Sequence, residues 1–249
     1  MLVKDVHGHV AWLRLDRPDK LNAMPRSFWG ELTGHMSALA DDPEVRVVVF
    51  HGAGRCFSVG GDIEDFGNLG GVADRRAYMR EALGAYRVVE QLPKPTIAAV
   101  HGHAAGGGCE LTMVCDIVVA DETARFSTPE GSVGLVPGLG IVRGRAHANL
   151  HWMKYLVMTG LPLGAGEAYQ AGLVNRVVPE GQHLAEAERL AEAIAQRSPL
   201  ALAVGKEVLN RGSAEGYDYA VEAIALLQGA DDFAEGIAAF TQKRKPQFP

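Results

Sequence analysis

Three short apolar runs constrain the fold most strongly, because each is rich in β-branched residues and too short to be a buried helix. They cover residues 45–50, 96–100 and 117–120. Runs of this kind are typical of strands buried on both faces, as in a parallel sheet covered by helices. A helical pattern over residues 74–91 separates the first two runs. The sequence therefore predicts a layered α/β fold.

The flanking regions extend this prediction. Residues 2–15 alternate as two short strands around a turn at Gly8, and a helix that follows is predicted to bury Phe28, Leu32, Met36 and Leu39. The composition shifts near residue 184, and the last third is predicted to be helical. Its apolar stripes are Leu184, Ala187, Leu190, Ala191 and Ile194, and then Phe233, Ile237 and Phe240. We expect an α/β core over residues 1–190 and a helical region over residues 191–249 that packs on the core or on another subunit.

Composition excludes several classes of protein. The 249 residues carry a net charge of -6 with both signs interspersed, which argues against nucleic acid as a partner. No apolar run approaches the roughly 20 residues that cross a bilayer, so no membrane partner is expected. The amino terminus lacks the pattern of a secretory signal. Cys56, Cys109 and Cys115 are odd in number and form no C-x-x-C pair, so we expect a reducing, cytoplasmic location.

Glycines are concentrated where the predicted strands end. A helix that begins near Gly108 would direct free backbone N–H groups toward a ligand, and the turn over residues 57–62 could supply another. Two such donors form an oxyanion hole, a site that stabilises negative charge on a substrate oxygen. Close packing of helix on strand explains an isolated glycine triplet equally well.

Two glutamates accompany these glycines. Glu110 lies in the first turns of the predicted helix, beside an apolar surface. A carboxylate is rarely found in such a place unless it is paired or has a function. Glu130 follows Pro129, which suits a helix start. Taken singly, each glutamate is also explained as an exposed first-turn residue favoured by the helix dipole.

Six motifs, in order, resemble the enoyl-CoA hydratase/isomerase family, the crotonase superfamily. They cover residues 15–24, 54–63, 101–116, 126–140, 171–179 and 240–248, so the resemblance extends over nearly the whole chain. It implies a crotonase-like spiral of ββα units with a C-terminal helical region. The motifs are most similar to those of enoyl-CoA hydratases.

The resemblance also implies an activity and its residues. The N–H groups of Val59 and Gly107 would hold the oxygen of an acyl-CoA thioester, and Glu110 and Glu130 would add water across its 2,3 double bond. Glu110 would deprotonate the water, while Glu130 would supply or relay the proton. Family members that hydrate carry both glutamates, whereas isomerases often keep one. Neither a metal nor a cofactor is required, because coenzyme A is part of the substrate.

Substrate binding and assembly follow from the same resemblance. The residues assigned to substrate binding are Lys20, Ala23, Gly60, Gly61, Asp62, Ile63 and Gly106. Lys20 is either a phosphate contact or a solvated loop lysine. The C-terminal helices imply a homotrimer or a dimer of trimers, in which Lys243 and Phe248 would complete a neighbour's coenzyme pocket.

Two positions depart from the family pattern: Gly61 replaces a usual alanine and Ile141 a usual glycine. Residues 143–152 lack the usual threonine-glutamine-arginine sequence, so the acyl chain preference stays open. An isomerase and a catalytically silent acyl-CoA-binding protein remain alternatives.

Two other readings of the sequence fail. His147 and His151 have the spacing of a helical zinc pair, but Ala148 replaces the glutamate that a metalloprotease needs. Likewise Gly52-Ala53-Gly54 resembles a dinucleotide fingerprint, but Phe57 occupies its third glycine position. His101 and His103 are interpreted as structural histidines.

Overall fold

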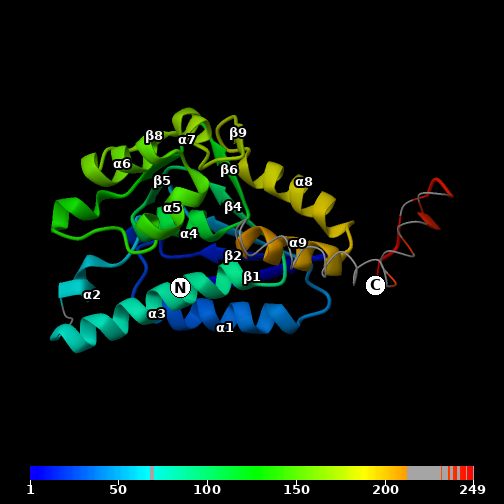
Figure 1. The fold of residues 1–249 in the computed structure, drawn as a ribbon, viewed down its shortest axis with the longest axis horizontal. Coiled ribbons are helices and arrows are strands. Elements are labelled where there is room, and N and C mark those ends of the chain that lie inside the picture. Colours follow the sequence, from blue (N-terminus) through cyan, green and yellow to red (C-terminus); the bar gives the residue numbers. More distant parts are fainter. Residues whose placement is uncertain are drawn as a thin grey trace.

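The computed structural model describes residues 1–67, 70–211, 231, 235, 238–239, 242–244 and 246–248. Two sheets and the helices around them make up this part of the chain (Figure 1). The six-stranded sheet has the order β1-β2-β3-β4-β6-β9, in which β1 and β2 are antiparallel and all other neighbours parallel. Its strands are β1 (Leu2–His7), β2 (Val10–Leu15), β3 (Val47–Gly52), β4 (Thr96–Val100), β6 (Ile117–Asp121) and β9 (Arg176–Val178). The smaller sheet contains β5 (His103–Ala105), β7 (Arg125–Ser127) and β8 (Leu163–Gly164).

The helices connect and cover these strands. They are η1 (Pro18–Lys20), α1 (Ser27–Asp41), α2 (Ile63–Gly67), α3 (Val72–Gln91), α4 (Gly107–Val114), η2 (Pro129–Val133), α5 (Gly140–His147), α6 (Leu150–Thr159), α7 (Ala165–Ala171), α8 (His183–Ala195) and α9 (Pro199–Arg211). None of the described helices combines the length and the apolar character needed to cross a bilayer.

The predicted α/β fold is confirmed. The run over residues 96–100 is strand β4. The runs predicted over residues 45–50 and 117–120 correspond to β3 and β6, which end two residues and one residue later. Helix α1 fully buries the four side chains assigned to its inner face, Phe28, Leu32, Met36 and Leu39. The predicted repeat is also present, because β4 and β6 are each followed by a short strand of the second sheet and then by a helix.

Helices cover both faces of the large sheet. Helices α1 and α3 run side by side on one face, where Val48 and Phe50 of β3 join the main core (Figure 1). Helix α8 covers the other face and packs on Val47 and Val49. Burial on both faces explains why β3 is a continuous apolar run, and it leaves the turns after the parallel strands as the place where side chains and backbone can meet a ligand.

Two predictions about the C-terminal part need correction. The boundary at residues 190 and 191 falls inside α8, and this helix packs on the large sheet as part of the core. Leu184 does not belong to its buried stripe: it is 37% exposed, whereas Ala187 and Ala191 are fully buried. The second stripe, at Phe233, Ile237 and Phe240, lies outside the described residues, and the oligomerisation role of this region stays a prediction.

Candidate active site

The glycine run at the start of α4 places a free N–H group at the predicted position. Gly106 has a positive φ of 52°, donates its N–H to the Ser127 carbonyl at 2.9 Å, and accepts the Glu110 N–H at 2.9 Å. A Cβ on Gly108 would lie 2.4 Å from the Ser58 carbonyl oxygen, so only glycine fits there. Within the described chain, no protein acceptor receives the N–H of Gly107. As the first residue of α4, Gly107 therefore offers this group to a ligand.

A second N–H group converges on Gly107 from the turn before α2. Met24 bridges this turn as a parallel strand would: its N–H donates to Gly60 O at 2.7 Å, and its carbonyl accepts from Asp62 N at 2.9 Å. In such a bridge the N–H of the middle residue, Gly61, points to the opposite side. That side is occupied by Gly107, since a Cβ built on Gly107 would lie 3.5 Å from Gly61 N.

The assignment of Val59 as an oxyanion donor is corrected by this geometry. The Val59 N–H donates to the Leu21 carbonyl at 3.2 Å and is therefore occupied. The Gly61 N–H has no acceptor among the described residues, and it lies beside Gly107. The candidate donors are thus Gly61 and Gly107. The choice between Val59 and Gly61 depends on which residue pairs with Met24. No pattern in the sequence predicted this pairing.

Glu110 is buried and anchored by backbone groups from a distant segment. Its side chain is 6% exposed, and Oε1 accepts the N–H of Leu139 at 2.7 Å and that of Gly140 at 2.8 Å. Because these two residues begin α5, the carboxylate caps the positive end of that helix. Burial raises the pKa of Glu110, while the two N–H donors oppose the rise. The alternative of an exposed first-turn glutamate is therefore wrong for Glu110.

Glu130 lies in a different environment. It is half-buried in η2, and its Oε1 comes within 3.2 Å of the point where a Cβ on Gly106 would stand. Its Oε2 is buried without a hydrogen-bond partner in the described structure. Burial raises the pKa of Glu130 to about 7, and the charge of Glu110 adds to the rise, although the Glu130 backbone N–H opposes it. One carboxyl is thus held by two N–H groups, and the other can be protonated near neutral pH.

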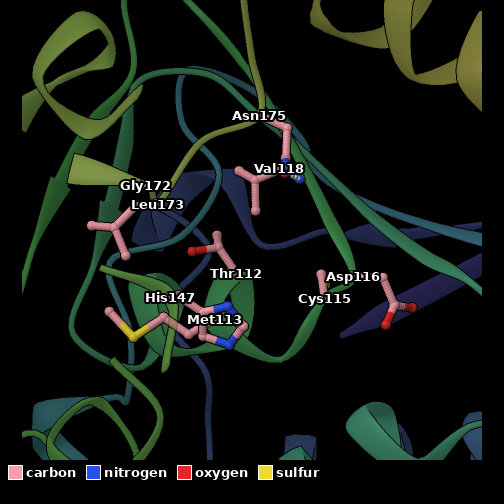
Figure 2. A pocket seen from close by; sticks show the side chains of 9 residues that line it. All are labelled: Thr112, Met113, Cys115, Asp116, Val118, His147, Gly172, Leu173 and Asn175. Carbon is pink, nitrogen blue, oxygen red and sulfur yellow. Dashed lines mark hydrogen bonds between the residues drawn. The ribbon is translucent and has the colours of Figure 1, made fainter. Parts of the chain in front are cut away.

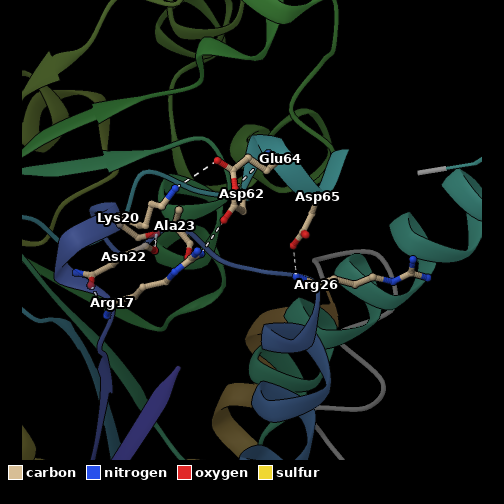
Figure 3. Close-up of polar contacts among 9 residues, drawn as sticks. Arg17, Lys20, Asn22, Ala23, Arg26, Asp62, Glu64 and Asp65 are labelled. Atoms are coloured by element: carbon tan, nitrogen blue, oxygen red, sulfur yellow. Dashed lines mark hydrogen bonds and ion pairs between the residues drawn. The ribbon is translucent and has the colours of Figure 1, made fainter. Parts of the chain in front are cut away.

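A buried polar network holds the loops that carry Gly61 (Figure 3). The Asn22 side chain is fully buried and donates to the carbonyls of Ala53, Cys56 and Phe57 at 2.8–3.1 Å. Its Oδ1 accepts the N–H of Arg17, whose guanidinium pairs with Asp62 at 2.7 Å. The hydrogen bond from Arg17 holds the pKa of Asp62 below its ordinary value. Neither Asn22 nor Arg17 was singled out from the sequence as a scaffold residue.

The residues predicted to bind substrate divide into two groups. Ala23 accepts a hydrogen bond from Arg17, and the segment from Gly60 to Asp62 is held by the bridge with Met24 and by the Arg17–Asp62 pair. Gly106 lies beside the carboxyl of Glu130. By contrast, Ile63 is 70% exposed at the start of α2, and Lys20 is exposed and pairs with Glu64 at 3.3 Å (Figure 3). A phosphate contact at Lys20 stays a prediction.

The C-terminal residues proposed to complete a neighbour's pocket are described only in part. Lys243 is exposed, and the Phe248 carbonyl accepts a hydrogen bond from Arg46 at 3.0 Å. Their contribution to a neighbouring subunit stays a prediction.

The histidines have structural surroundings. His147 ends α5 whereas His151 belongs to α6, so the two do not share one helix as a helical zinc pair would. His101 contacts the Gly54 carbonyl through Nε2 at 2.9 Å and stacks on His183 with ring centroids 4.6 Å apart.

A small cavity lies apart from the two glutamates. It has a volume of about 60 Å³, and Thr112, Asp116, His147 and Asn175 are among its lining residues (Figure 2). Neither glutamate and neither candidate donor lines it. Its size and polar lining suit a few ordered water molecules better than a substrate.

Comparisons with known proteins identify the family and the fold. The model of the enoyl-CoA hydratase/isomerase family matches residues 5–249. A probable enoyl-CoA hydratase of Mycobacterium bovis is 37% identical over 249 residues, which cover 96% of this chain and 94% of that protein. A probable enoyl-CoA hydratase of Rhizobium meliloti is 38% identical, with 99% and 97% covered. The crystal structure of an enoyl-CoA hydratase from Bacillus anthracis superposes with a TM-score of 0.94 at 30% identity, covering 99% of this chain and 98% of that one.

Proposed function

Because the chain belongs to the enoyl-CoA hydratase/isomerase family, we propose that it is an enoyl-CoA hydratase, which adds water across the 2,3 double bond of an enoyl-CoA thioester. One observation carries the proposal: two carboxyls with different surroundings, the buried Glu110 and the half-buried Glu130, lie beside a pair of unoccupied N–H groups. Hydration needs both a base for water and an acid for carbon, and two such carboxyls can meet that need.

The N–H groups of Gly61 and Gly107 activate the substrate in this proposal. They donate to the thioester oxygen. In this way they stabilise the enolate that forms when the oxygen of water attacks the β-carbon. Losing one such donor costs on the order of 3 kcal/mol of transition-state stabilisation. Since both donors are backbone groups fixed by the surrounding loops, they need no reorganisation during the reaction.

The glutamates divide the proton transfers. Glu110 accepts a proton from the attacking water, whose oxygen bonds to the β-carbon, and protonated Glu130 gives its proton to the α-carbon. The support for this division is electrostatic: burial raises the pKa of both carboxyls, but two N–H groups oppose the rise at Glu110 and favour its carboxylate, whereas the pKa of Glu130 is raised to about 7. A proton passed from Glu110 to Glu130 through solvent then restores the starting state.

Substrate and setting complete the proposal. The segment from Lys20 to Ala23 and the turn from Gly60 to Ile63 bind coenzyme A, and the enzyme works as a homotrimer or a dimer of trimers. The chemistry requires no metal or organic cofactor. Cys56, Cys109 and Cys115 are buried free thiols, which is compatible with the proposed cytoplasmic location.

The test is hydration of crotonyl-CoA by the purified full-length chain, followed as loss of its conjugated ultraviolet absorbance. Glu110→Gln should lower kcat by about 10²- to 10⁴-fold, because the water loses its base. Binding of butyryl-CoA, a saturated thioester that cannot react, should change little. Glu122→Gln, at an exposed position, is the matched control and should keep full activity.

Two outcomes would favour the alternatives. Conversion of a 3-enoyl thioester to the 2-enoyl form without hydration would indicate an isomerase. Binding of butyryl-CoA with no reaction of any enoyl thioester would indicate a silent acyl-CoA-binding protein.

A further inference from the structure

The hydroxyl group of Tyr86 makes a buried hydrogen bond at the first residue of α4. It donates to the Gly107 carbonyl at 2.7 Å, and the side chain, from α3, is only 2% exposed. The contact is tight, since a Cβ on Gly107 would lie 2.8 Å from this hydroxyl. Tyr86 thus contacts the carbonyl of the residue whose N–H is the candidate donor.

Three consecutive glycines make such a contact necessary. Gly106, Gly107 and Gly108 have no side chains and more backbone freedom than other residue types, so contacts with other residues must fix the direction of the Gly107 N–H. The structure fixes the peptides on both sides of this residue. The Gly106 carbonyl, in the peptide that carries the Gly107 N–H, accepts from Glu110 N at 2.9 Å, and the Tyr86 hydroxyl donates to the Gly107 carbonyl in the next peptide at 2.7 Å.

The tyrosine is itself held in place. Its ring packs edge-on against Trp29, with centroids 5.3 Å apart, and Trp29 also contacts Phe28 of α1. Burial, together with the charge of Glu110, raises the pKa of Tyr86 well above its ordinary value. The phenol therefore stays protonated and remains a hydrogen-bond donor throughout the pH range of an activity assay.

We propose that Tyr86 is a positioning residue for catalysis: its hydroxyl orients the Gly107 N–H toward the thioester oxygen without touching the substrate. The proposal rests on the hydratase function proposed above and adds a residue to it. The enolate oxygen carries more negative charge than the carbonyl oxygen of the bound substrate. Misdirecting the donor therefore removes more stabilisation from the enolate than from the bound substrate. The cost should therefore fall on kcat, whereas KM should barely change.

The experiment compares Tyr86→Phe, which removes only the hydroxyl, with the wild-type enzyme and with Tyr78→Phe. Tyr78 is the matched control, because it lies eight residues earlier on α3, is 1% exposed and packs against the same Trp29 ring. Two quantities are measured: kcat and KM for crotonyl-CoA between pH 6 and 9, and the absorption shift of bound cinnamoyl-CoA. This conjugated thioester absorbs at longer wavelength when its carbonyl is polarised.

Tyr86→Phe should lower kcat about tenfold or more, leave KM within about twofold, and reduce the absorption shift. The shape of the pH profile should not change, since an uncharged donor is replaced by a hydrogen atom. Tyr78→Phe should match the wild type in all these respects. Wild-type kcat and an undiminished shift in Tyr86→Phe would overturn the proposal, and so would an altered pH profile, which would make Tyr86 an acid or base.

Two further measurements keep the outcomes separate. The absorption shift needs binding and polarisation but no hydration, so a wild-type enzyme that shifts the spectrum without adding water would contradict the hydratase function and leave Tyr86 testable. If Tyr86→Phe does not fold, Tyr86→Trp, which keeps an N–H donor, is compared with Tyr86→Met, which keeps none. The tryptophan variant should show the larger shift, and equal shifts would overturn the proposal.

Discussion

Replacing Glu130 with glutamine should slow hydration by orders of magnitude and, above neutral pH, make the folded protein more stable. The reason lies in the buried Oε2 atom, which has no hydrogen-bond partner in the described structure. An ionised carboxylate in that position is poorly solvated, and the pKa of Glu130 accordingly rises from 4.5 to about 7. Glutamine has nearly the same shape but carries no charge at any pH.

The magnitude follows from proton linkage. Between pH 4.5 and about 7 the folded state binds a proton at Glu130 that the unfolded state has already lost, so the free energy of unfolding falls as the pH rises through this window. A shift of this size corresponds to about 3 kcal/mol at pH 8. The gain in Glu130→Gln should be about 2 kcal/mol, because the glutamine amide also lacks partners at this position. Below pH 4.5, where Glu130 is protonated in both states, only the cost of the unpaired amide remains, and the variant should be about 1 kcal/mol less stable than the wild type.

Chemical denaturation at pH 4.5, 6, 7 and 8 measures the stability, and hydration of crotonyl-CoA over the same range measures the activity. In the wild type, kcat/KM should fall as the pH rises above about 7, because Glu130 loses the proton that it donates. The variant should lose about 10²- to 10⁴-fold in kcat. Equal stability of the two proteins at pH 8, or a variant that keeps wild-type turnover, would refute the reasoning.

Two further substitutions test the scaffold. Gly108→Ala should severely destabilise the fold or prevent folding, because its Cβ would lie 2.4 Å from the Ser58 carbonyl, whereas Gly34→Ala in α1, where nothing lies within 4 Å, should stabilise the helix by about 0.5–1 kcal/mol. Melting temperatures of both variants check the contrast, and similar values would contradict it. Asn22→Ala should lower the free energy of unfolding by about 3 kcal/mol, because three carbonyls lose a buried donor and alanine is strained at a φ of 57°. A loss below about 1 kcal/mol in chemical denaturation would show that the Asn22 contacts are replaceable.

Local pattern was sufficient for much of the fold. The β-branched run over residues 96–100 is strand β4 at its predicted ends, and α1 buries the predicted stripe. Both elements are decided by side chains close together in sequence, which periodicity detects. Leu184 was placed wrongly: Ala187 and Ala191 are buried against the sheet and Leu190 and Ile194 pack beside them, whereas Leu184, in the first turn of α8, is 37% exposed.

The candidate site was less accessible, because long-range backbone contacts build it. Glu110 is held by N–H groups 29 and 30 residues further along the chain, and no residue type is required to provide them. The choice of Gly61 over Val59 depends on the bridge with Met24, and the contact of Tyr86 with Gly107 depends on how α3 packs against α4. Family resemblance pointed to the two glutamates and to Gly107. It assigned the second donor to Val59, whereas the pairing of Met24 with Gly61 makes Gly61 the candidate.

The anchoring of Glu110 by Leu139 and Gly140 also bears on how new specificities could arise in this scaffold. The same stretch of chain presents Val136 and Val142 to the outside, 63% and 66% exposed. An insertion or substitution that reshapes that outer surface is expected to move the two amides and, with them, the carboxyl of Glu110. Selection for a different substrate would therefore change turnover as well. Successful variants are expected to carry substitutions at the outer residues together with changes around Leu139 and Gly140.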